Sequence, residues 1–132
     1  MRNYGMSEPR VRIARVVGFG LLAEVATAII IVSALRIFAS GDEAAALRLS
    51  AILGPGFGVL FTYIAALLAA RPVADRARLH GVLVGVVTSI LTIPGMFAAP
   101  SSMLPIYLGA VLLKLAAGWA AGAQVEWKGR EA

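Results

Sequence analysis

The chain has 132 residues, of which 60% are hydrophobic and 14% charged, and its mean hydropathy is +0.86. A soluble domain carries about 25% charged residues, so this composition excludes an ordinary soluble fold. The formal net charge of +5 comes from basic residues beside apolar blocks, so we expect contacts with a lipid bilayer and its anionic headgroups, and none with nucleic acid.

Four apolar blocks follow one another, each close to the ~20 residues that a helix needs to cross a hydrocarbon core of about 30 Å. We therefore predict an all-α integral membrane bundle of four transmembrane helices, with polar tails at both ends. The predicted spans are residues 16–38, 49–70, 79–98 and 104–125, and the tails are residues 1–15 and 126–132.

The first span follows a basic tail and is followed by small residues, a pattern that also suits a secretory signal peptide. The apolar run is longer than the apolar region of a typical signal peptide, and it contains Glu24. We therefore predict that this segment is a retained helix.

Glycine and proline mark the second and third spans. The segment Gly-Pro-Gly-Phe-Gly at 54–58 loosens the backbone, which membrane proteins tolerate where neighbours or water satisfy the freed carbonyls. We expect a kink or a late helix start near Pro55, with residues 44–49 forming a separate short helix along the interface. Pro94 is expected to bend or end the third span, whereas Pro105 suits the first turn of the fourth.

Lys and Arg are distributed unevenly about the spans. Nine lie in the N-terminal tail, the connection between the second and third spans, and the C-terminal tail, whereas only Arg36 and Arg48 lie on the opposite side. By the positive-inside rule both termini are cytoplasmic. The expected location is the bacterial cytoplasmic (inner) membrane, which the protein crosses several times.

Glu24 and Lys114 are the two charged residues placed deep within predicted spans. Glu24 lies eight residues from Val16 and Lys114 eleven residues from Val125, so their depths are about 12 and 16 Å at 1.5 Å per residue. An ionised residue at the centre of a membrane helix costs about 2.5–3.5 kcal/mol, which an opposite charge partly offsets. The sequence therefore predicts an intramembrane Glu24–Lys114 ion pair.

Hydroxyl groups of the other two spans lie at a similar depth and complete a predicted polar layer. Two interpretations stay open: the hydroxyls satisfy the ion pair and their own backbone, as in many helix bundles, or the layer is an ion or proton site. The hydroxyl members are Thr62, Tyr63, Thr88 and Ser89.

Small residues recur at a spacing of four and are predicted to let helix backbones approach closely. Packing within the chain is the simpler interpretation, and the seam of a homodimer or larger membrane complex is the alternative. The pairs are Gly54–Gly58, Gly81–Gly85 and Gly118–Gly122.

No cofactor or metal site is predicted. The chain has no cysteine, and His80 is its single histidine, for which we expect an interfacial position. The glycines at 54–58 are not followed by the Lys-Ser/Thr of a phosphate loop.

Parts of the chain resemble segments of known membrane-protein families. Leu21 to Val25, Leu-Leu-Ala-Glu-Val, resembles the first-helix motif of the small multidrug resistance exporters, which implies four spans and a glutamate that binds both a proton and a cationic drug. The aromatic-rich second and third helices of that family have no counterpart here. Residues 70–86 and 112–122 are similar to segments of uncharacterised small four-span bacterial membrane proteins, which implies a fold and no activity.

The sequence favours a small non-enzymatic membrane protein, an accessory or assembly component in which Glu24 and Lys114 form an internal clasp. The alternative is a small proton-coupled transporter or channel that uses Glu24. A hydrated cavity that reaches Glu24 would favour transport, and a closed, well-packed interior would favour the clasp.

Overall fold

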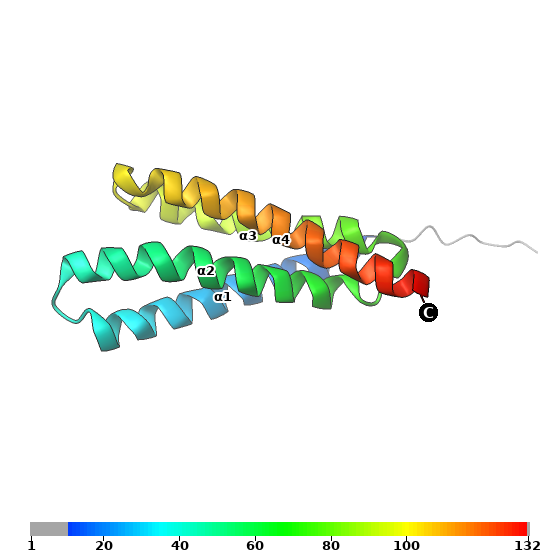
Figure 1. Cartoon of the computed structure of the whole chain (residues 1–132), viewed down its shortest axis with the longest axis horizontal. Coiled ribbons are helices and arrows are strands. Elements are labelled where there is room, and N and C mark those ends of the chain that lie inside the picture. Colours follow the sequence, from blue (N-terminus) through cyan, green and yellow to red (C-terminus); the bar gives the residue numbers. More distant parts are fainter. Residues whose placement is uncertain (1–10, 132) are drawn as a thin grey trace, which may run out of the picture.

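The structure is a computed structural model that describes residues 11–131, and four long helices account for most of them (Figure 1). All four are long and apolar enough to cross a membrane, which confirms the prediction of an all-α bundle of four membrane-spanning helices. The helices are α1 (Ile13–Phe38), α2 (Glu43–Ala70), α3 (Ala77–Ala98) and α4 (Leu104–Glu131), with short 3-10 helices η1 (Ala74–Arg76) and η2 (Ser101–Met103) before α3 and α4.

The turn between α1 and α2 is set by two residues. Gly41 has φ of +84°, a left-handed conformation that glycine adopts at little cost. Asp42 caps α2, because its side chain accepts a hydrogen bond of 3.0 Å from the backbone N–H of Ala45. The turn therefore fixes α2 antiparallel to α1.

Helix α2 differs from the prediction in its first half. It begins at Glu43 and runs through Pro55 to Ala70 without interruption, so the expected late start is wrong, and residues 44–49 belong to α2 itself. Proline has no N–H to donate to the carbonyl four residues earlier, here that of Ala51. Ala51 and Pro55 both line a cavity, the setting in which such a carbonyl is tolerated at membrane depth.

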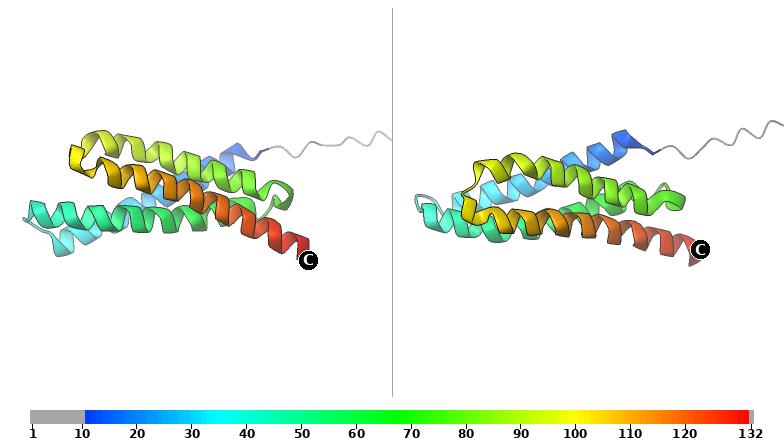
Figure 2. Two further views of the ribbon diagram at one scale, coloured as in Figure 1. Left: turned by 45° about the horizontal axis from the view of Figure 1, so that its top comes forward. Right: turned by 90° about the horizontal axis from the view of Figure 1, so that it is seen from above.

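The helices form two antiparallel hairpins, α1–α2 and α3–α4 (Figures 1 and 2). Going round the bundle, α1 packs on α2, α2 on α4, α4 on α3 and α3 on α1, so that α1 and α4 face each other across a diagonal with little backbone contact. The hairpins converge at the end where Ile13 and Glu131 lie, here called the terminal end. They diverge towards the end with the α1–α2 and α3–α4 connections, here called the turn end.

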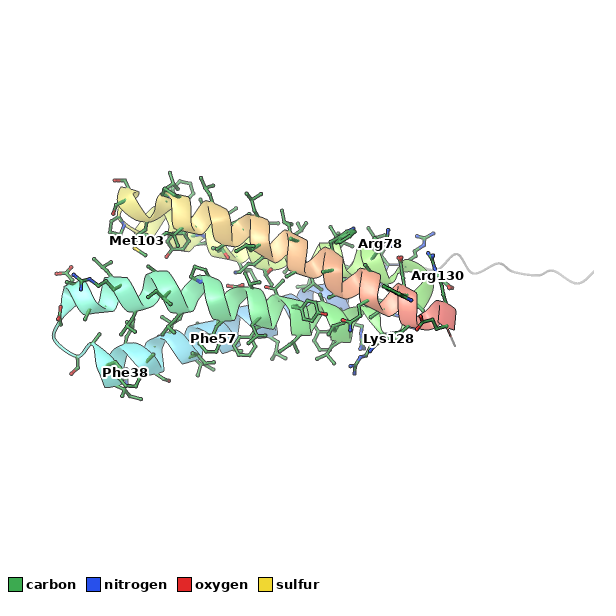
Figure 3. All side chains as sticks on the ribbon, in the orientation of Figure 1. Phe38, Phe57, Arg78, Met103, Lys128 and Arg130 are labelled. Atoms are coloured by element: carbon green, nitrogen blue, oxygen red, sulfur yellow. The ribbon has the colours of Figure 1, made fainter. Side chains whose placement is uncertain are left out.

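Small and polar side chains fill the interior of the bundle, whereas large apolar side chains cover its outside. Ala66, Ala69 and Val84 are fully buried, while Leu22 and Phe97 are mostly exposed. Exposed apolar residues occur on all four helices, which suits a surface in contact with lipid rather than a single interaction patch. Arg78, Lys128 and Arg130 mark the terminal end in Figure 3.

Helices α3 and α4 pack with their backbones in contact. A Cβ built on Gly118 would lie 2.3 Å from the carbonyl oxygen of Gly81, and one on Gly85 would lie 2.8 Å from that of Lys114. A Cβ on Gly122 would likewise lie 2.6 Å from the carbonyl oxygen of Ala77. The glycine pairs of α3 and α4 therefore serve packing within the chain, since only glycine permits this approach.

The glycines of α2 do not form such a seam. A Cβ on Gly54 would meet only the Ile31 side chain, at an ordinary 3.7 Å, and one on Gly58 would meet the side chain of Lys114. The expectation of close backbone approach at Gly54–Gly58 is therefore wrong. Gly58 instead provides room for a charged side chain.

Candidate functional site

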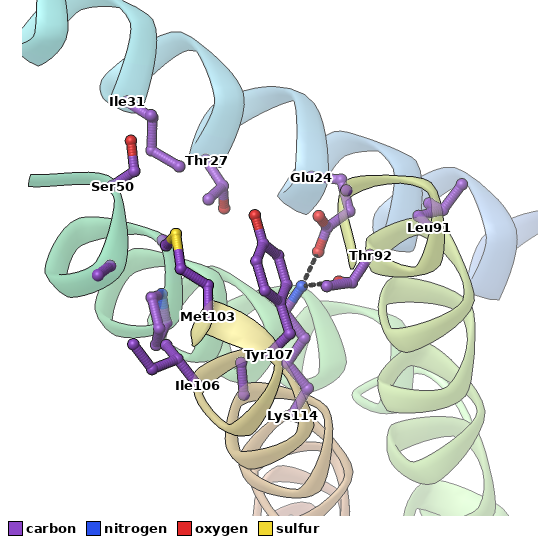
Figure 4. A pocket seen from close by; sticks show the side chains of 15 residues that line it. Glu24, Thr27, Ile31, Ser50, Leu91, Thr92, Met103, Ile106, Tyr107 and Lys114 are labelled. Carbon is purple, nitrogen blue, oxygen red and sulfur yellow. Dashed lines mark hydrogen bonds and ion pairs between the residues drawn. The ribbon is translucent and has the colours of Figure 1, made fainter. Parts of the chain in front are cut away.

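Lys114 and Glu24 form an ion pair inside the bundle (Figure 4). The Lys114 ammonium donates to Oε1 of Glu24 and, over 2.6 Å, to the hydroxyl of Thr92 on α3. The Lys114 side chain is 4% exposed and that of Glu24 is 21% exposed. The lysine is thus enclosed by protein, while the carboxylate keeps an open side.

The pair connects the two helices that lie across the diagonal. The Lys114 backbone packs against Gly85, whereas its ammonium reaches Thr92, seven residues further along α3 towards the turn end. Helical side chains lean towards the N-terminus of their helix, which for α4 is the turn end. The extended Lys114 side chain passes over Gly58 of α2 on its way to Glu24 of α1.

A cavity of about 260 Å³ lies on the turn side of the ion pair. A single water molecule needs only about 10–15 Å³ by this measure, so the space admits several waters or a small solute. From the pair the cavity extends to Ser50, seven residues from the start of α2, and to Met103 in η2. All four helices contribute to it: its lining is Glu24, Thr27, Ile31, Ser50, Ala51, Gly54, Pro55, Leu91, Thr92, Gly95, Met103, Ile106, Tyr107, Ala110 and Lys114.

Two buried threonines close the bundle on the terminal side of the pair. Thr62 of α2 and Thr88 of α3 are both fully buried, and their hydroxyl oxygens are 3.2 Å apart. The single proton of the Thr62 hydroxyl has two acceptors within reach, the Thr88 hydroxyl and the carbonyl of Gly58, while the Thr88 hydroxyl donates to the carbonyl of Gly85. These contacts satisfy the hydroxyls and tie α2 to α3 below the cavity.

Tyr63 and Ser89 lie apart from the ion pair. The Tyr63 hydroxyl donates to Gln124 of α4, and the Ser89 hydroxyl lies 3.5 Å from the carbonyl oxygen of Val111. The predicted polar layer is therefore divided in space into the ion pair, the Thr62–Thr88 contact and two separate links to α4. Among the four predicted hydroxyl residues, none donates to or accepts from Lys114 or Glu24 in the described chain.

Three residues of the site that the sequence reasoning missed, one bonded to Lys114 and two that line the cavity, lie one or two helical turns from residues it found. Thr92 follows Thr88 by four residues, and Thr27 follows Glu24 by three. Tyr107 precedes Lys114 by seven residues and lies on the same face of α4. Helical periodicity applied towards the turn end would have found all three.

Further polar links join the helices near the terminal end. Arg15 donates to the carbonyl of Leu68 over 2.8 Å, and Arg78 forms a 2.9 Å ion pair with Glu126. In residues 11–131, the side-chain hydrogen bonds that join one helix to another therefore lie between the level of Thr92 and the terminal end. The turn half of the bundle contains the cavity.

His80 lies in the first turn of α3 and is buried within the bundle, with 1% exposure. Its Nε2 accepts from the backbone N–H of Arg12 over 3.2 Å, and its Nδ1 lies 2.9 Å from the carbonyl oxygen of Arg76. The ring is therefore the neutral tautomer with hydrogen on Nδ1, because Nε2 must be an acceptor. His80 therefore binds the start of α1 to the start of α3, and its interfacial position stays a prediction.

The site offers one ammonium, one carboxylate and several hydroxyls at the base of an apolar cavity. Within residues 11–131, no cluster of three His, Asp or Glu side chains could hold a metal ion. The available chemistry is charge recognition and hydrogen bonding.

The fold and the site together define a class, a multi-pass membrane protein of four antiparallel helices with an ion pair at the base of a cavity. No protein-family model matches the chain, and neither a curated protein nor a solved structure matches it.

Proposed function

We propose that the protein is a small transporter of the bacterial cytoplasmic membrane, in which the Glu24–Lys114 pair receives its cargo from the cavity. The observation that carries this proposal is that the cavity reaches both members of the pair. A dry internal clasp has no need of such a space. The proposal is for non-enzymatic binding and transfer of a proton or a small solute.

The positive-inside rule supports an orientation with the terminal end in the cytoplasm. In that orientation the cavity lies in the outer half of the membrane and receives cargo from outside. The Thr62–Thr88, Tyr63–Gln124 and Arg12–His80 contacts join the two hairpins and hold the inner half closed. Such an asymmetric bundle corresponds to one state of a transporter that alternates between two openings.

Glu24 is the residue through which proton coupling would act. A proton on Glu24 removes its negative charge and so weakens its bond to Lys114, because the attraction between opposite charges is lost and the ammonium then donates to a neutral acceptor. Lys114 is then free to bind an anionic group from the cavity. In the small multidrug resistance exporters the glutamate binds cationic drugs. Here Lys114 already neutralises the charge of Glu24. This supports a cargo other than a cationic drug.

The test is proton flux into liposomes that contain the purified protein and a trapped pH-sensitive dye. A potassium diffusion potential drives the flux, and we expect Glu24→Gln to abolish it without loss of folded protein. Glu126→Gln is the matched control, because it removes a carboxylate from the terminal end and leaves the cavity unchanged. Flux that is unaltered in Glu24→Gln would remove Glu24 from the mechanism.

A second candidate is the accessory component with an internal clasp. It is favoured by the enclosure of Lys114, which already bonds both Glu24 and Thr92. Its partners would be other membrane proteins or a second copy of the chain. Copurification from native membranes, together with normal complex formation by a folded Glu24→Gln/Lys114→Met double variant, would support this candidate over transport.

A further inference from the structure

Both members of the ion pair line the cavity, and each has hydrogen-bonding capacity that its contacts within residues 11–131 do not use. An ammonium has three N–H donors, and Lys114 uses two of them, on Glu24 and Thr92. Glu24 accepts through Oε1, and within residues 11–131 its Oε2 has no bonded partner. One donor of a cation and one oxygen of an anion are therefore available side by side.

The charge balance of the site limits which ligands it can hold. Lys114 and Glu24 carry one charge of each sign, so the empty site is neutral. A ligand with a single net charge would leave one charge without compensation in surroundings of low polarity, which is strongly unfavourable. A ligand that carries both charges keeps the balance and can match each protein group with its opposite.

The rest of the cavity favours an aliphatic body of modest size. Its apolar walls come from Ile31, Pro55, Leu91, Met103 and Ile106. Its volume of about 260 Å³ is slightly smaller than the volumes of typical ligand pockets, which run from about 300 to 1,000 Å³. A compact hydrocarbon group suits this space.

We propose that the cavity binds a small zwitterion with an aliphatic side chain, its carboxylate on Lys114 and its ammonium on Glu24. A branched aliphatic α-amino acid has this chemistry. Thr27 and Tyr107 line the same cavity, and the Thr27 hydroxyl, which already donates to the carbonyl of Ala23, can accept from the ammonium of the ligand. This inference rests on the proposed function and names the cargo of the same site.

The test uses three probes with one hydrocarbon skeleton. L-leucine carries both charges, 4-methylpentanoate lacks the amino group, and 3-methylbutylamine lacks the carboxylate. Binding to the purified full-length protein in detergent is measured by calorimetry and by the shift in thermal unfolding. We expect leucine to bind at least about tenfold more tightly than either single-charge probe, which corresponds to about 1.4 kcal/mol.

Two charge variants make the test specific to the assigned contacts. Glu24→Gln leaves Lys114 as the single charge, so the preference should change from leucine to 4-methylpentanoate. Lys114→Met leaves Glu24, so the preference should change to 3-methylbutylamine. Replacing a residue that only stabilised the fold would not change which of the three probes binds most tightly. If a variant fails to fold, the comparison of the three probes on the wild-type protein still tests the proposal.

Two outcomes would overturn the inference. One is equal or tighter binding of a single-charge probe by the wild-type protein. The other is no binding of leucine, valine or norleucine by folded protein. Either result leaves the proton-flux experiment on Glu24 untouched, so failure of the cargo assignment is distinguishable from failure of the transport proposal.

Discussion

Gly58 lies directly beneath the side chain of Lys114. A Cβ built on Gly58 would be 3.0 Å from Cε and 3.5 Å from Nζ of the lysine, and no backbone atom of α4 is among its nearest neighbours. The absent side chain therefore provides the space through which Lys114 crosses from α4 to Glu24. This explains a glycine at a buried position in the middle of α2, where glycine otherwise costs about 1 kcal/mol.

We expect Gly58→Val to displace Lys114 from Glu24, because the added carbons overlap its stem. Crowding of this kind costs about 1–3 kcal/mol, measured as a lower stability in detergent unfolding, and should also lower proton flux. Gly56→Val is the matched control, since a Cβ on Gly56 meets nothing within 4 Å. Equal effects at the two positions would show that the lysine does not depend on this space.

The ion pair itself can be tested with a double-mutant cycle of Glu24→Gln and Lys114→Met. Each single variant strands one charge, so each should lose stability, by roughly 2–3 kcal/mol because Glu24 keeps some exposure. The double variant strands no charge and should be more stable than either single variant. The measurement is unfolding in detergent micelles, and losses that simply add would contradict the pairing.

Sequence reasoning reached the ion pair because depth along a span follows directly from residue count. The helical rise alone places Glu24 and Lys114 at similar depths, and a flexible lysine stem covers the remaining difference. The same reasoning put Tyr63 and Ser89 in one layer with them, although depth does not determine which way a side chain faces. Their partners are Gln124 and Val111 instead.

The cavity could not be predicted because it depends on how far the two hairpins diverge. Pro55 signalled an irregular backbone, yet the local sequence does not show whether α2 starts late or continues. The role of His80 could not be predicted for a related reason. The position of His80 near the end of a span does not show that its ring bonds the backbone N–H of Arg12 and the carbonyl of Arg76.

The opening of the cavity can be mapped with introduced cysteines, because the natural chain has none. We expect Ser50→Cys and Tyr107→Cys to react with a membrane-impermeant maleimide applied to whole cells, since both residues line the cavity. Ala66→Cys, at a fully buried position in the terminal half, is the matched control and should stay unlabelled. Unlabelled cysteines at both cavity positions would contradict an outward-facing cavity and with it the proposed transport function.

The backbone contact between α3 and α4 gives a second glycine prediction. We expect Gly118→Ala to destabilise the protein by about 1–3 kcal/mol or more, because its Cβ would lie 2.3 Å from the carbonyl oxygen of Gly81 and backbone cannot easily move aside. Gly109→Ala is the control on the same helix, with nothing within 4 Å, and should be neutral or slightly stabilising. The measurement is the stability of both variants to unfolding in detergent. If Gly118→Ala leaves the stability unchanged, α3 and α4 do not pack this closely.

The buried ring of His80 should hold the start of α1 in place. In His80→Phe the ring volume is kept, but the backbone N–H of Arg12 loses its acceptor. The Arg76 carbonyl loses only the ring donor, because Arg76 caps α3 and its carbonyl accepts the first helical hydrogen bond. A backbone N–H without a partner costs about 1–3 kcal/mol when buried, and less here because water can reach the part-buried site. We expect faster hydrogen exchange at the Arg12 amide, with the amide of Ala45, capped by Asp42 at the opposite end, as an internal control. Unchanged exchange at Arg12 would show that another contact anchors α1 at the terminal end.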